Sequence, residues 1–142
     1  MQSTATGVQA TERVEDLLQE AYRQLPPGAT LKPRGGVAEL PCDDPTDNGP
    51  AGRVFIEKVY QVAFPAGWPA DRALPALVQY WQPPQYRVHN DRRDAPDPRF
   101  AVETTDGYRV SIEVFVRPAG NLDVYLGGSS PCVWEHGTPD PQ

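Results

Sequence analysis

The stretch FAVETTDGYRVSIEVFVR, residues 100–117, decides the fold of this chain. Two runs of alternating apolar residues flank Asp106-Gly107, a dipeptide typical of a two-residue hairpin turn with positive φ at both positions. Glu103 and Glu113 have the opposite parity and should face solvent. The residues that should face the core together are Tyr108, Val110, Ile112, Val114 and Val116.

The flanking segments extend this hairpin into an α+β fold. Alternating β-branched and aromatic residues predict further strands at 37–40, 53–64, 85–89 and 122–126. Apolar residues spaced three and four apart predict helices at 11–25, with Thr11 as N-cap, and at 70–82. Strands joined in series, with helices set apart, predict an antiparallel sheet of about four to five strands with two helices packed on one face.

The length of 142 residues corresponds to one domain. We expect a disordered leader at residues 1–10, a single α+β domain at 11–135 and a disordered tail at 136–142. Proline clusters mark the loops and ends of this domain rather than one long disordered block.

Two cysteines, Cys42 and Cys132, are the only ones in the chain, and each follows a proline. Their positions beside turn formers, near opposite ends of the domain, predict one disulfide bond. Such a bond indicates an oxidising compartment outside the cytoplasm. It would close a loop of about 90 residues, for which chain entropy predicts a stabilisation of about 4 to 5 kcal/mol.

The net charge and the hydropathy of the chain restrict which partners it can bind and where in the cell it can reside. The formal net charge is −6 and no basic stripe is available to displace phosphate counterions, so we expect no nucleic-acid partner. No apolar run approaches the roughly 20 residues that span a bilayer. Export would require a signal segment that has been removed, because the polar residues 1–7 do not form one.

Side chains able to carry catalysis or bind metal are scattered. His89 and His136 lack companion ligands at metal-binding spacing, so neither a metal nor another cofactor is expected. Ser129 and Ser130 precede a proline rather than a helix, unlike a hydrolase nucleophile. For the acidic segment 43–48, a solvated loop is preferred to a calcium site. No catalytic residue is assigned.

An uncovered face of the sheet is the predicted contact surface, because two short helices protect only one side. Three aromatic residues, Trp68, Trp134 and Tyr86, are the candidate binding residues, and a structural role in the fold is the alternative for each.

The C-terminal part of the chain resembles a known group of proteins. Asp106-Gly107-Tyr108-Arg109-Val110-Ser111, leading to Gly128-Ser129-Ser130-Pro131-Cys132-Val133-Trp134, is similar to the endings of small secreted lipoproteins of Streptomyces and related actinobacteria. The group is largely uncharacterised. The resemblance implies export, a disulfide bond and a membrane anchor through a lipidated N-terminal cysteine, which is absent from this sequence.

These observations predict a non-catalytic, lipoprotein-like domain of the cell envelope, secreted or on the outer face of the cytoplasmic membrane, that binds another envelope protein or a small ligand. Two alternatives stay open. A small secreted hydrolase would need His89 in a pocket, within hydrogen-bond reach of a carboxylate and a nucleophile. An inhibitor of a secreted enzyme would need a protruding loop, such as residues 91–98.

Overall fold

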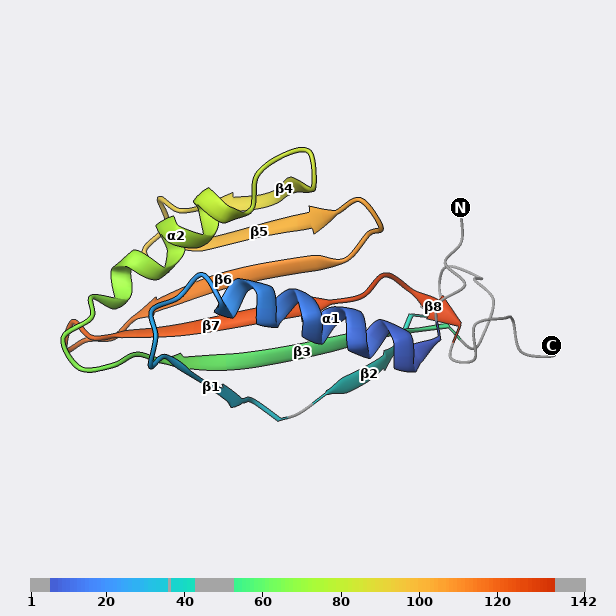
Figure 1. The fold of residues 1–142 in the computed structure, drawn as a ribbon, viewed down its shortest axis with the longest axis horizontal. Coiled ribbons are helices and arrows are strands. Elements are labelled where there is room, and N and C mark those ends of the chain that lie inside the picture. Colours follow the sequence, from blue (N-terminus) through green and yellow to red (C-terminus); the bar gives the residue numbers. More distant parts are fainter. Residues whose placement is uncertain (1–5, 36, 43–52, 135–142) are drawn as a thin grey trace.

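The computed structural model describes residues 6–35, 37–42 and 53–134, which form an α+β fold (Figure 1). The second predicted helix, 70–82, is a short 3-10 segment, η1, followed by α2. In chain order the elements are α1 (Gly7–Tyr22), β1 (Thr30–Pro33), β2 (Ala38–Pro41), β3 (Arg53–Ala63), η1 (Ala70–Arg72), α2 (Ala73–Tyr80), β4 (Tyr86–Arg92), β5 (Arg99–Thr104), β6 (Arg109–Val116), β7 (Leu122–Ser129) and β8 (Val133–Trp134).

Helix α1 begins earlier than the sequence pattern predicted. Its N-cap is Thr6 rather than Thr11: the Thr6 hydroxyl accepts a hydrogen bond from the Gln9 backbone N–H, and the Gln9 side chain accepts one from the Thr6 N–H. This reciprocal pair is a capping box. Residues 6–10, predicted as part of a disordered leader, therefore belong to the folded domain, and Ala10 is fully buried.

The strands of the described residues form one eight-stranded sheet in which every pair is antiparallel. Strands β4 to β7 follow one another as a meander, and β7 then pairs with β3. The prediction of about four to five strands was wrong. The 11-residue strand β3 is long enough to pair with β1 and β2 along one side and with β7 and β8 along the other (Figure 1).

The hairpin around Asp106-Gly107 forms, but its loop has three residues, 105–107, rather than the predicted two. The Thr104 N–H donates to the Tyr108 carbonyl at 2.7 Å, and the Gly107 N–H donates to the Thr104 carbonyl at 3.0 Å. Gly107 has a φ of 90°, in the left-handed region that glycine enters at no steric cost. This is the hairpin class in which a turn is followed by one left-handed residue.

Both helices pack on the same face of the sheet, as predicted, and one core lies between the two layers (Figure 1). Helix α1 contacts β3 and β7, and α2 contacts β5 and β6. Four of the five side chains predicted to face the core from residues 108–116 are buried. The fifth, Val116, is 50% exposed because it ends β6 and lies next to a turn.

The predicted disulfide bond is confirmed. Cys42 and Cys132 are bonded, and their Cα atoms are 6.0 Å apart. Cys42 directly follows β2, and Cys132 directly precedes β8. Since β2 and β8 both pair with β3, the bond joins two short strands that depend on the same long one.

Candidate functional site

The face of the sheet opposite the helices is uncovered in the part of the chain that the structure describes. Residues directly opposite each other on paired strands share a face, so the register arranges this face in rows that cross the strands. The middle row, from β4 to β3, is Asn90, Ala101, Ser111, Gly127 and Val59. One flanking row is Arg92, Arg99, Glu113, Tyr125 and Gln61. The other is Arg87, Glu103, Arg109, Ser129 and Glu57.

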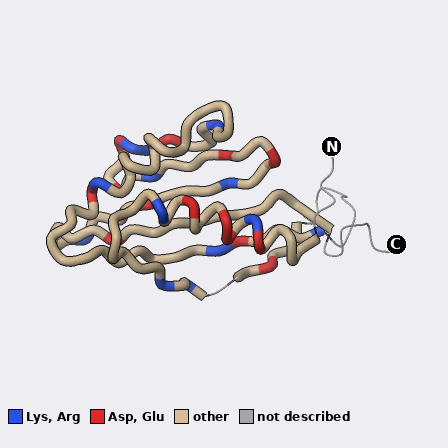
Figure 2. The backbone as a smooth tube through the Cα atoms, viewed as in Figure 1, with Lys and Arg blue, Asp and Glu red and all other residues tan. Residues whose placement is uncertain are grey.

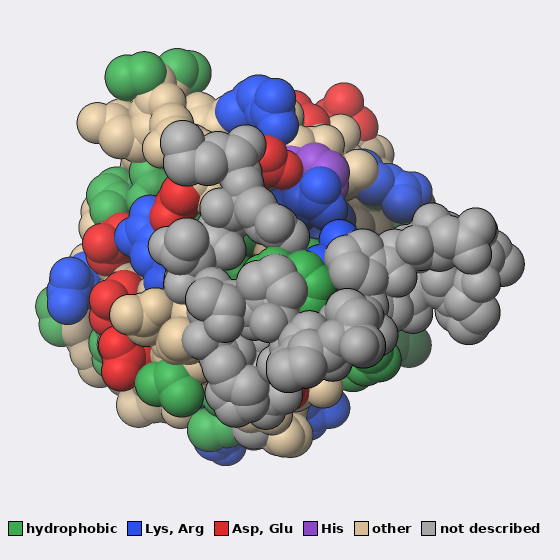
Figure 3. All heavy atoms as spheres, turned by 90° about the vertical axis from the view of Figure 1, so that its right-hand side faces the viewer, with side chains coloured by type: hydrophobic (Ala, Val, Ile, Leu, Met, Phe, Trp, Pro, Cys, Tyr) green, Lys and Arg blue, Asp and Glu red, His purple; other side chains and the backbone are tan. Residues whose placement is uncertain are grey.

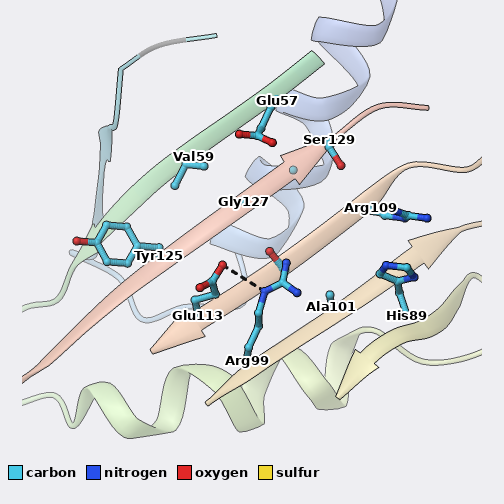
Figure 4. Close-up of a pocket in the computed structure, with 12 residues that line it drawn as sticks. Glu57, Val59, His89, Arg99, Ala101, Arg109, Glu113, Tyr125, Gly127 and Ser129 are labelled. Carbon is cyan, nitrogen blue, oxygen red and sulfur yellow. Dashed lines mark hydrogen bonds and ion pairs between the residues drawn. The ribbon is translucent and has the colours of Figure 1, made fainter. Parts of the chain in front are cut away.

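The middle row has small residues, Ala101, Ser111 and Gly127, on three neighbouring strands. Longer side chains on either side enclose a hollow of about 270 Å³, and the small residues form its floor (Figure 4). A Cβ placed on Gly127 would lie 3.3 Å from Ser111 Oγ and 3.8 Å from Val59 Cγ2. The hollow therefore exists because three small residues stand in register between two rows of large ones.

Ion pairs hold the walls of the hollow. Arg99 Nε lies 3.2 Å from Glu113 Oε1, the contact drawn as a dashed line in Figure 4. Two arginines share Glu103: Arg87 Nη2 lies 2.7 Å from Oε1, and Arg109 Nε lies 3.1 Å from Oε2. The hydrogen bond from Arg109 lowers the pKa of Glu103, against the opposing effect of burial. Charges of both signs also intermingle along the rest of the described chain (Figure 2).

Tyr125 of β7 and Glu57 of β3 line the hollow from opposite flanking rows. The Tyr125 ring contacts the Phe115 ring edge-on, with centroids 5.5 Å apart, and the Arg34 guanidinium lies 5.7 Å from the Tyr125 centroid. These contacts fix the tyrosine as part of the wall. Glu57, in the other flanking row, is exposed, and its carboxylate forms no hydrogen bond or ion pair with any other described residue.

His89 lies at the β4 end of the hollow, at a register shift of β4 between Val88 and Asn90. It lines the hollow together with Arg99 and Arg109 (Figure 4). Figure 3 shows side chains of the histidine, Lys or Arg, and Asp or Glu colours close together on the described surface. His89 is exposed, and no described carboxylate or hydroxyl is hydrogen-bonded to it. The site therefore places His89 in a hollow but does not assemble a hydrogen-bonded catalytic set.

The two tryptophans predicted as candidate binding residues lie outside the hollow. Trp134 is only 3% exposed, and Trp68 is half-buried and stacks on Phe64 with ring centroids 4.7 Å apart. Both side chains pack within the fold, which is the structural alternative that the sequence left open.

Tyr86, the third candidate binding residue, lines a second hollow of about 390 Å³. Its hydroxyl donates to Glu20 Oε2 at 3.4 Å, and burial raises its pKa, so it stays protonated at neutral pH. Arg13, in the same lining, lies 3.3 Å from Asp106 Oδ2. Because these polar groups already bond to one another, the second hollow offers a ligand fewer free partners than the first.

The serines and strand carboxylates considered in the sequence have different roles: one serine is structural, and the other residues lie on the open face. Ser130 is structural: its Oγ accepts from the Ile56 N–H at 2.8 Å and donates to the Pro131 carbonyl at 2.8 Å. Ser129 instead lines the hollow. The two strand carboxylates predicted to face solvent, Glu103 and Glu113, lie on the open face, where they and Glu57 belong to the flanking rows of the hollow.

Four residues that line the hollow were not predicted from the sequence: Arg99, Arg109, Ser111 and Gly127. One signal was present, since the two arginines have the same parity along their strands as the carboxylates beside them. Parity alone does not say which residues stand opposite one another on neighbouring strands. That pairing forms the floor of the hollow, and it depends on the register of β5, β6 and β7.

Other chemistry considered from the sequence finds no support in the described residues. The acidic segment 43–48 and His136 lie outside them. Within the described ranges, no group of three or more histidine, cysteine, aspartate or glutamate side chains could hold a metal ion. No helix in those ranges is both long and apolar enough to cross a membrane.

Comparison with known proteins adds no relative: no protein-family model, curated protein or solved structure matches this chain.

Proposed function

We propose that this chain is a non-catalytic binding domain of the cell envelope, or a secreted one, and that its open sheet face binds a small ligand. The disulfide between Cys42 and Cys132 supports a location outside the cytoplasm, because such bonds persist in oxidising compartments. The similarity of the C-terminal segments to actinobacterial lipoproteins supports the envelope in particular.

The observation that carries the proposal is the hollow on the open face. Its floor of Ala101, Ser111 and Gly127 belongs to three central strands, so the site rests on a rigid part of the sheet. Its volume of about 270 Å³ is close to the lower end of the range for small-molecule sites, roughly 300 Å³. This space suits a small ligand better than it suits the flat surface of a partner protein.

A small secreted hydrolase is the second candidate. His89, Ser111 and Glu113 line the same hollow, and a base, a hydroxyl and a carboxylate are the residue types of a nucleophilic site. Turnover of a generic ester that disappears in a His89→Ala variant would favour this candidate and overturn the proposal of a non-catalytic domain.

The test of the binding proposal uses the isotope-labelled, disulfide-bonded chain and a library of small polar fragments. Binding fragments should shift the amide resonances of Ala101, Ser111 and Gly127 in two-dimensional NMR spectra. A Ser111→Leu variant should abolish these shifts, because the larger side chain occupies the floor.

The matched control is Val116→Leu, which introduces the same side chain on the same strand at an exposed position. This variant should bind fragments as the unmodified chain does. Fragments that shift only resonances outside the hollow, or that bind the Ser111→Leu variant equally well, would contradict the proposal.

A further inference from the structure

The hollow has an uneven distribution of charge along its length. His89 of β4, Arg99 of β5 and Arg109 of β6 line it, with Glu113 paired to Arg99, whereas the unpaired carboxylate of Glu57 lies on β3. Figure 4 shows the two groups on opposite sides of the floor, with Ser129 close to Glu57. A ligand that matches this pattern carries a negative group at one end and a positive group at the other.

The two arginines retain donors that the fold does not use. Arg99 and Arg109 each bond a glutamate through Nε, at 3.2 and 3.1 Å, and within the described residues neither terminal pair of nitrogens makes a hydrogen bond. The Nε contacts orient both guanidinium planes. The terminal N–H groups of Arg109, which shares a row with Glu57, can then bind a carboxylate in the bidentate manner that guanidinium favours.

The opposite end offers a matching acceptor. Glu57 is exposed and lines the hollow, and its carboxylate has no partner among the described residues. An unpaired carboxylate suits a ligand ammonium group, with which it forms a charge-assisted hydrogen bond.

The register sets the length of the ligand. Arg109 stands opposite Ser129, and Ser129 stands opposite Glu57, so two strand spacings separate the charged residues. Two spacings are about 10 Å. An extended peptide of about three residues has the same span, at roughly 3.3 Å for each residue.

We infer that the hollow binds a short zwitterionic peptide of about three residues, with its carboxylate on Arg109 and its ammonium group on Glu57. This inference rests on the proposed function, of which it specifies the ligand. The narrow floor beside Ser111 selects small side chains in the bound peptide. Both ends of the peptide are recognised by charge, so blocking either end should weaken binding.

The experiment titrates the labelled, disulfide-bonded chain with trialanine and compares it with N-acetyl-trialanine and trialanine amide. Trialanine should shift the amide resonances of Ala101, Ser111 and Gly127, and each blocked peptide should bind about tenfold more weakly, because it loses one charge-assisted contact. In the protein, Arg109→Gln and Glu57→Gln should weaken trialanine binding to a similar degree.

The control variant is Arg87→Gln. Arg87 bonds the same glutamate as Arg109 but does not line the hollow, so its removal should change trialanine binding less than twofold. If Arg87→Gln and Arg109→Gln weaken trialanine binding equally, binding depends on the ion pairs with Glu103 rather than on direct contact between Arg109 and the peptide. This result would overturn the inference.

The outcomes separate the inference from the proposed function. If trialanine leaves the floor resonances unchanged, or if the blocked peptides bind as well as trialanine, the zwitterion inference is wrong. If other fragments still shift those resonances, the open face remains the binding surface. If neither peptide nor fragment shifts them, both proposals fail.

Discussion

Two neighbouring glycines in β7, Gly127 and Gly128, face opposite sides of the sheet and are small for different reasons. A Cβ on Gly128 would lie 3.1 Å from Val14 Cγ1 and 3.4 Å from Leu18 Cγ, so α1 occupies the space above it. A Cβ on Gly127 would project into the floor of the hollow, 3.3 Å from Ser111 Oγ. On the covered face a missing side chain makes room for a helix, and on the open face it leaves room for a ligand.

The charged side chains of the two faces differ in the same way. On the covered side, Glu15 of α1 accepts a hydrogen bond from the Tyr60 hydroxyl at 2.7 Å and lies 2.9 Å from Lys58 Nζ. Its partners therefore come from the fold itself. On the open side, Arg99 and Arg109 bond only through Nε within the described residues. The covered face uses its polar groups for stability, whereas the open face keeps donors available for recognition.

The largest expected effect comes from removing the disulfide bond, which joins strands at one end of β3. Replacing Cys42 and Cys132 by alanine opens a loop with a sequence separation of 90 residues. Chain entropy predicts a loss of about 4 to 5 kcal/mol in the free energy of unfolding. Denaturant unfolding of the variant beside the oxidised chain measures the loss, and coincident unfolding midpoints would contradict it.

A substitution on each face of β7 compares the faces directly. Leu126 is fully buried under the helices, so Leu126→Ala should lower the free energy of unfolding by about 3 kcal/mol. Its neighbour Tyr125 is half-buried on the open face, and Tyr125→Ala should lower it by about 1 kcal/mol. Thermal and denaturant unfolding of both variants provide the values. Equal losses would mean that the open face is packed like the covered one.

Substituting each of the two glycines by alanine tests the same difference between the faces with a smaller expected effect. Gly128→Ala should lower the free energy of unfolding by about 1 to 3 kcal/mol, because the added methyl group crowds Val14. Gly127→Ala should stay within about 0.5 kcal/mol of the unmodified chain, because its methyl group enters the hollow. The same unfolding measurements suffice, and a costly Gly127→Ala would show that the floor is already filled.

The smallest expected effect on the free energy of unfolding comes from the Glu15 carboxylate, and this effect depends on pH. Burial alone would raise the pKa of this carboxyl, but hydrogen bonds from Tyr60 and Lys58 outweigh burial and lower the pKa from its ordinary value of 4.5. The folded chain then binds this proton more weakly than the unfolded chain does. The stabilisation is fully present above pH 4.5 and is lost as the pH falls through the lowered value.

Glu15→Gln should therefore lower the free energy of unfolding by about 1 kcal/mol at neutral pH and have a progressively smaller effect in acid. Tyr60→Phe, which keeps the ring and removes the hydroxyl, should reproduce part of the change. Unfolding curves between pH 2 and about 7 measure both variants. An effect of Glu15→Gln that is the same at every pH would contradict the role of the charge.

The register of the central hairpin could not be predicted correctly from the sequence pattern. A two-residue turn at Asp106-Gly107 would have placed Ala101 opposite Ile112. A residue that faces the open side would then have been paired with a residue that faces the core. The three-residue loop places Ala101 opposite Ser111 and keeps each face consistent. A shift of one residue exchanges the two faces of a strand, so burial of the apolar face selected the longer loop.

The start of α1 was missed for a different reason. Thr6 followed three residues later by Gln9 is a capping-box pattern, but the apolar stripe that suggested the helix is clear only after Thr11. Ala10 is fully buried against the sheet, a contact that a helix pattern by itself does not reveal. Tertiary packing therefore extended the helix beyond its most obvious local signal.

The sequence by itself determined what short-range chemistry governs: two amphipathic helices, an alternating meander, a glycine turn and a single pair of cysteines that could bond. It also indicated that one face of the sheet would be left open, because two short helices cannot cover both. Only the tertiary structure decided that Ala101, Ser111 and Gly127 lie in one row between two flanking rows that carry arginines and an unpaired glutamate. These residues come from different strands, and their neighbours across the sheet are set by hydrogen-bond register and core burial rather than by their neighbours in the chain.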